Sequence, residues 1–113
     1  MTLKELRTQI DALDLQLVDL LNKRATTVLK IGHLKAAHAM PVHEPAREKV
    51  VYANARAANH GPLPDIELIR IFERLIDVMR SLEMHESDME MNAQANEPGQ
   101  GVGAETPETG KKQ

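Results

Sequence analysis

The sequence contains no cysteine and no tryptophan, and its 113 residues include one phenylalanine and one tyrosine. Without cysteine the chain has no disulfides and no thiolate metal ligands, which permits an intracellular location. Strands are enriched in aromatic and β-branched residues, so this shortage of aromatic side chains favours an all-α fold. The core of such a fold would consist of Leu, Ile, Val and Met.

The sequence also lacks a long apolar run and a recognisable secretory signal. No stretch approaches the ~18 apolar residues of a membrane span, and the N-terminus is amphipathic from its first residues. No basic face with stacking aromatics is visible either, which argues against nucleic acid as a partner. We therefore expect a cytoplasmic protein with neither a membrane nor a nucleic acid as its partner.

The net charge of −3 is unevenly distributed along the chain. Residues 1–85 carry twelve Lys or Arg and eleven Asp or Glu, whereas residues 86–113 carry two and six. The composition there turns to Glu, Asn, Gln, Gly, Thr and Pro, with little to bury, which is typical of disorder. We expect one helical domain over 1–86 and a disordered acidic tail over 87–113, which we interpret as solvating and dispensable.

No proline precedes Pro41, and the stretch from Thr2 to about Ala37 has the pattern of one uninterrupted helix. Its apolar residues recur at spacings of three and four and form a single stripe, made of Leu3, Leu6, Ile10, Leu13, Leu17, Leu20, Ile31 and Leu34. A helix of about 36 residues is ~54 Å long, whereas a compact domain of this size has a radius of gyration of only ~12 Å. Such a rod cannot bury its whole stripe against its own chain.

Two further helices are expected after the long one. Pro45 begins a helix that runs to about Asn59, and Asp65 is a good N-cap for another that continues at least to Met84. Gly32 is interpreted as a point where a neighbouring helix comes close. Three helices of such unequal length do not close a core by themselves, so we expect an intertwined homodimer. A monomeric long-helix hairpin is the less economical alternative, because it leaves part of the stripe in water.

Charged residues interrupt the apolar faces of these helices. Arg24 falls in the seven-residue register of the stripe, and Lys35 lies within roughly 20° of it around the helix. Glu83 lies within the apolar arc of the third helix, while Arg47 and Glu48 border the buried side of the second. Unpaired charges in a core cost several kcal/mol, so these residues need partners. Because the cations outnumber the acids, the enclosed site suits a small, multiply anionic ligand.

The same pattern offers neither a nucleophile nor a metal cluster. The chain has no cysteine, no serine lies on a core face, and the five histidines fall in or near turns or singly on helices. We therefore expect no metal and no cofactor. Arginines would clamp a dicarboxylate in one conformation, and a cationic pocket of this kind suits a reaction driven by conformational restraint and electrostatics.

Several short motifs follow one another in a fixed order: Leu6-Arg7-x-x-Ile10-Asp11-x-Leu13-Asp14, Leu20-Leu21-Asn22-Lys23-Arg24, Ile31-Gly32-x-x-Lys35, Pro45-x-Arg47-Glu48 and Ile71-Phe72. Together they resemble the all-α class of chorismate mutases over about residues 3–84. The resemblance implies an intertwined dimer of three-helix chains with two equivalent sites. It also implies an isomerase that converts chorismate to prephenate, the branch step toward phenylalanine and tyrosine, by a pericyclic rearrangement without a cofactor.

The resemblance assigns catalytic and substrate-binding roles residue by residue. Arg7, reaching in from the partner chain, and Arg24 would bind the two carboxylates of chorismate. Lys35 would bind a carboxylate and the ether oxygen, where negative charge grows as the carbon–oxygen bond breaks. Glu48 would accept a hydrogen bond from the ring hydroxyl.

The resemblance also assigns roles to four other positions, and at some of them this sequence differs from the family pattern. Arg47 and Glu44 would support the hydroxyl side of the pocket, with Glu44 in place of the more usual aspartate. Met79 stands where relatives often have a small or hydroxylated residue. Glu83 stands where the family has glutamine or glutamate, opposite Lys35 on the ether oxygen. A glutamate there helps only when protonated, because an ionised one repels the developing oxyanion.

Two alternative functions remain open from the sequence. Isochorismate pyruvate lyases share the fold and the cationic pocket, although the Arg47-Glu48 pair favours the mutase. In a non-catalytic helical dimerisation or regulatory module, Arg24–Glu48 and Lys35–Glu83 would be salt bridges that set the dimer register. The sequence does not indicate whether an end product regulates the protein or whether it docks to another enzyme of the pathway.

Overall fold

The computed structural model describes residues 1–95, which form three helices joined by short connections. The helices are α1 (Leu3–Ala37), α2 (Pro45–Ala58) and α3 (Asp65–Ala95). This part of the chain contains no strand, so the all-α prediction is confirmed.

The first helix, α1, is a continuous rod of 35 residues, ~52 Å long. A capping box closes its start: the Thr2 hydroxyl accepts from the Glu5 backbone N–H at 3.1 Å, and the Glu5 carboxylate accepts from the Thr2 N–H at 2.7 Å. The helix ends where Ala39 takes a left-handed backbone conformation (φ 54°), two residues before Pro41. The predicted bounds of the long helix are confirmed.

The second and third helices also begin where the sequence predicts. Pro45 is the first residue of α2, and the Asp65 carboxylate at the start of α3 accepts a hydrogen bond from Asn59 Nδ2 at 2.6 Å. Helix α3 continues to Ala95, past residue 86, through a stretch that contains no proline or glycine to end it. The rest of the expected tail, 96–113, lies outside the described residues.

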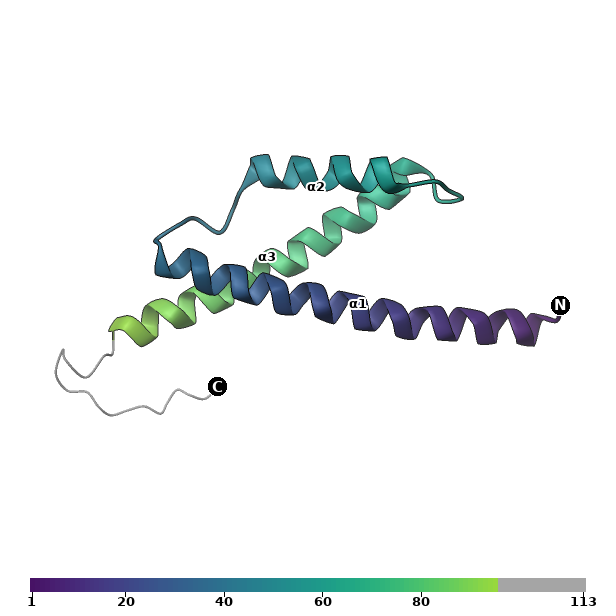
Figure 1. Ribbon diagram of the computed structural model, residues 1–113, viewed down its shortest axis with the longest axis horizontal. Helices are drawn as coiled ribbons and strands as arrows, with labels where there is room; N and C mark the ends of the chain where they lie inside the picture. The colour runs from purple at the N-terminus through teal and green to yellow at the C-terminus, as the bar shows by residue number, and fades with distance from the viewer. Residues whose placement is uncertain (96–113) are drawn as a thin grey trace.

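Helix α3 is the central element of the arrangement (Figure 1) and packs against both α1 and α2. It crosses the C-terminal half of α1, while the N-terminal half of α1, purple in Figure 1, extends beyond the other helices. At the crossing Gly32 is buried, and a Cβ there would lie 3.0 Å from Glu83 Cγ and 3.2 Å from the Glu83 carbonyl oxygen. The predicted close approach at Gly32 is confirmed.

The hydrophobic core of one chain is small. Among the described residues, the buried apolar side chains are those of Ala55, Ile76 and Met79. By contrast, Ile10 and Leu17 in the stripe of α1 are each 55% exposed. No helix in the described part of the chain is long and apolar enough to cross a membrane. Large apolar side chains left in water along one face are typical of a surface that pairs with another protein.

Candidate active site

A pocket of about 320 Å³ lies between the three helices, at the size expected for a small-molecule site. Every helix and the connection between α1 and α2 contribute to its walls. It is lined by Arg24, Thr27, Val28, Ile31, Lys35, Val42, Glu44, Arg47, Glu48, Val51, Ile76, Met79, Arg80 and Glu83. The structure thus brings together seven of the eight site residues that the sequence singled out. The eighth is Arg7, which lies elsewhere on α1.

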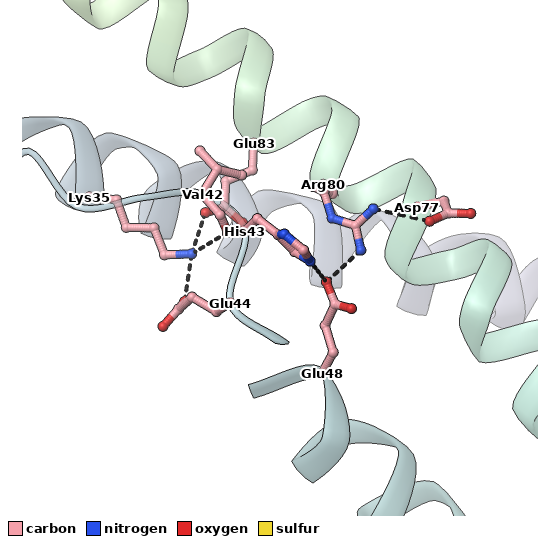
Figure 2. A network of polar contacts seen from close by, with 8 residues as sticks. All are labelled: Lys35, Val42, His43, Glu44, Glu48, Asp77, Arg80 and Glu83. Atoms are coloured by element: carbon pink, nitrogen blue, oxygen red, sulfur yellow. Dashed lines mark hydrogen bonds and ion pairs between the residues drawn. The ribbon is translucent and has the colours of Figure 1, made fainter. Parts of the chain in front are cut away.

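Lys35 is the most highly connected side chain of the pocket (Figure 2). Its Nζ lies 2.6 Å from Glu44 Oε1 and 2.6 Å from Glu83 Oε2, and it donates to the Val42 carbonyl oxygen at 3.0 Å. Burial lowers the pKa of Lys35, but the hydrogen bonds and charges of the two carboxylates outweigh it, and the net pKa is raised. The ammonium therefore stays charged although Lys35 is only 6% exposed.

Glu44 and Glu83 reach this ammonium from two different elements. Glu44 occupies the N-cap position of α2, but its side chain makes no capping hydrogen bond there. Its carboxylate points to Lys35 instead, which ties the start of α2 to the end of α1. Glu83 comes from the buried face of α3, as its place in the apolar arc predicts. The Lys35–Glu83 pair foreseen in the salt-bridge interpretation is present.

The opposite wall of the pocket carries two arginines. The pKa of Arg24 is lowered, first because the guanidinium is partly buried and second because the positive charge of Arg47 lies nearby. Two like charges held next to each other favour the binding of an anion between or beside them. This wall is therefore suited to a carboxylate ligand.

Arg80 also lines the pocket, although the sequence pattern did not single it out. Arg80 Nη2 donates to Glu48 Oε2, so Glu48 is paired across helices α2 and α3. The signal was present in the spacing: Arg80 lies four residues after the buried Ile76 and three before Glu83, which places all three on one helix face. The residue was missed because it sits at the edge of the apolar arc.

The chemistry of the lining is electrostatic. Four cations face three carboxylates, so the pocket has a positive surplus even within one chain. The hydroxyl of Thr27 is occupied, because it donates to the Lys23 carbonyl oxygen at 3.1 Å. Among the residues whose side chains the structure describes, no group of three or more His, Cys, Asp or Glu is placed to hold a metal ion.

Arg7 cannot reach the pocket of its own chain. It is exposed and lies seventeen residues before Arg24 on the same straight helix. At about 1.5 Å per residue this separation is ~26 Å, far beyond the length of an arginine side chain.

Comparison with known proteins gives the family to which this fold and pocket belong. The model of the family described as chorismate mutase type II matches residues 6–84. A bifunctional chorismate mutase/prephenate dehydratase of Aquifex aeolicus is 35% identical over 85 residues, covering 72% of this chain and 24% of the relative. The chain thus spans about a quarter of the length of that bifunctional relative.

Two other proteins match over most of their own length. A 4-amino-4-deoxychorismate mutase of Streptomyces venezuelae is 32% identical over 83 residues, which cover 72% of this chain and 80% of the relative. The structure of chorismate mutase (form II) from Thermus thermophilus superposes with a TM-score of 0.71 at 30% identity, covering 72% of this chain and 92% of that one. From the family model, the fold and the pocket together, this chain belongs to the chorismate mutase type II family.

Proposed function

We propose that the protein is a chorismate mutase, an isomerase that converts chorismate to prephenate without a cofactor. The observation that supports the proposal is the pocket itself, which is lined by Arg24, Lys35 and Arg47 together with Glu48 and Glu83. A cationic pocket between helices restrains a flexible dicarboxylate and stabilises charge that develops during the rearrangement.

The proposed roles follow the walls of the pocket. Arg24 binds one substrate carboxylate, and Arg7 of the partner subunit binds the other. Lys35 and Glu83, which are neighbours at 2.6 Å, both lie beside the breaking ether bond. Glu48 accepts from the ring hydroxyl, with Arg47 and Glu44 supporting that side, and Met79 supplies a buried apolar surface.

The ligand-free contacts indicate how the substrate enters. The Lys35 ammonium is in contact with three groups: it forms ion pairs with Glu44 and Glu83 and donates a hydrogen bond to the Val42 carbonyl. The substrate therefore has to displace one of these groups. The Glu44 side chain is 41% exposed and that of Glu83 is 11% exposed, so Glu44 is the contact that opens most readily.

The site is completed by a homodimer in this proposal. Arg7 is ~26 Å along α1 from Arg24, so it can serve a pocket only in a second chain. Pairing of two α1 rods would also cover the exposed stripe. The surplus positive charge would then match the two carboxylates of chorismate.

The test is incubation of the purified full chain with chorismate, followed by its ultraviolet absorbance and by identification of the product. Loss of chorismate with formation of prephenate is the expected result. Turnover of isochorismate to release pyruvate, with chorismate untouched, would identify a lyase on the same fold. No turnover of either would favour the non-catalytic helical module.

A further inference from the structure

Glu48 does not enter the pocket as an isolated carboxylate. Its Oε2 accepts from Arg80 Nη2, and His43 Nε2 lies 3.7 Å from the same oxygen (Figure 2). The side chains of Glu48 and Arg80 are 22% and 30% exposed, so water screens the pair only in part. The charge of Glu48 is therefore largely balanced by that of Arg80.

The guanidinium of Arg80 is itself fixed in place. Its Nη1 donates to Asp77 Oδ1 at 3.2 Å, one helical turn back on α3. The hydrogen bond to Glu48 is the main reason that the pKa of Arg80 is raised, with further contributions from the charges of Glu48 and Asp77. Arg80 Nε is buried without a hydrogen-bond partner in the described part of the chain. A rigid, permanently charged group thus stands behind the carboxylate that we assign to the ring substituent.

We propose that Arg80 determines substrate specificity at the ring position that Glu48 contacts, favouring a hydroxyl over an amino group. The inference rests on the proposed function, and in particular on the contact between Glu48 and the ring. Arg80 is not a catalytic residue in this account. It acts through Glu48, by setting the charge of the corner into which the ring substituent points.

The physical basis is a difference between a neutral donor and a cationic one. A ring hydroxyl needs only an acceptor, and Glu48 keeps its second oxygen for this purpose. An alkyl amine is protonated near neutral pH, so it would bring a second positive charge next to Arg80. An unpaired Glu48 would attract that ammonium, whereas a Glu48 already neutralised by Arg80 does not. In a partly buried pocket the like charges cost at least about tenfold in kcat/KM, or about 1.4 kcal/mol.

The test compares two substrates in matched variants of the full chain. The kcat/KM is measured for chorismate and for its analogue with an amino group in place of the ring hydroxyl. Wild type is expected to prefer chorismate. Arg80→Met, which keeps bulk and removes charge, should raise the ratio of amino to hydroxyl substrate by about tenfold or more. Arg80→Lys keeps the charge and should preserve the wild-type ratio within about threefold.

A control variant tests whether the loss of another arginine on α3 also changes the substrate ratio. Arg70 pairs with Glu67 at 3.0 Å on the same helix, outside the pocket. Arg70→Met removes a comparable ion pair and should leave the ratio unchanged. If Arg80→Met does not fold, as judged by helical circular dichroism, Arg80→Gln provides the same removal of charge while keeping a donor for Glu48.

The possible results distinguish failure of the specificity role of Arg80 from failure of the proposed mutase function. Wild type that converts chorismate, together with an unchanged ratio in the Arg80 charge-removal variant, overturns this inference and leaves the proposed function intact. An equal loss of both activities in that variant also overturns it, because a structural role lowers both alike. Wild type that prefers the amino substrate contradicts it directly. No turnover of either substrate by wild type overturns the proposed function and the inference with it.

Discussion

At the scale of single residues, Lys35 shows how the protein keeps a charge inside a small core. The side chain is almost fully buried, and two carboxylates contact its ammonium at 2.6 Å. Because the pKa of Lys35 is raised, its ion pairs contribute stability that is fully present below the ordinary lysine pKa of 10.5 and is lost as the pH rises through the higher folded value.

Replacing Lys35 by Met is expected to destabilise the fold by about 3–5 kcal/mol at neutral pH, because it leaves buried Glu83 without its counter-charge. The difference in unfolding free energy between Lys35→Met and wild type should shrink as the pH rises through the raised pKa of Lys35, since the wild-type lysine then loses its charge. Urea denaturation between about pH 8 and about pH 12 measures this difference. The exposed Lys30→Met is the control. A difference that does not change with pH would contradict the assignment.

Glu83 holds the Lys35 ammonium at 2.6 Å and lies beside the breaking ether bond in the proposed reaction. We expect Glu83→Gln to keep chorismate turnover, because an amide of the same shape can accept from Lys35 and donate to the ether oxygen, on which negative charge grows. Glu83→Ala offers neither contact and should lower kcat by at least about tenfold. The kcat and KM of both variants provide the measurement, with Glu73→Ala on an exposed part of α3 as control. An unchanged kcat in Glu83→Ala would exclude Glu83 from this role.

At the scale of elements, the crossing of α1 over α3 sets the geometry of the pocket. Gly32 allows the two backbones to approach, and the atoms it faces belong to Glu83. The same contact therefore packs the helices and places a site residue.

Gly32→Ala is expected to lower activity more than stability. The new methyl would lie 3.0 Å from Glu83 Cγ and 3.2 Å from its carbonyl oxygen, so α3 must shift by a few tenths of an ångström. Overpacking of this kind costs about 1–3 kcal/mol, and alanine regains up to about 1 kcal/mol in helix propensity. We expect a small loss of unfolding free energy and a fall in kcat of at least about tenfold, because a small displacement of Glu83 weakens its contact. Lys30→Ala on the same helix controls for the change to alanine, and unaltered kcat in Gly32→Ala would disprove the link.

Features set by local sequence could be predicted, whereas contacts set by the path of a connection could not. The helix bounds follow from local chemistry at Pro41, Pro45 and Asp65, and the stripe register located the inward cations of α1. Arg80 was not predicted as a site residue because it lies at the edge of the apolar arc of α3, where helical periodicity does not separate buried from exposed positions. The contact from Glu44 to Lys35 depends on the path of the connection between α1 and α2, and helical periodicity says nothing about that path.

At the scale of the whole molecule, one chain leaves its longest apolar face in water. The small core and the exposed stripe both support the proposal that the functional unit contains two chains. In such a dimer each α1 would contribute to two pockets. It would supply Arg24 and Lys35 to the pocket of its own chain and Arg7 to the pocket of the partner chain.

Mixing two inactive variants shows whether each site is shared between two chains. Arg7→Ala and Lys35→Ala chains are each expected to lose chorismate turnover, since every site in either homodimer lacks one group. After unfolding and refolding as an equimolar mixture, half of the dimers contain one chain of each kind, and one of their two sites is intact. The mixture should therefore recover about a quarter of wild-type activity. Two inactive variants whose mixture stays inactive, although mixed dimers form, would contradict a site shared between chains.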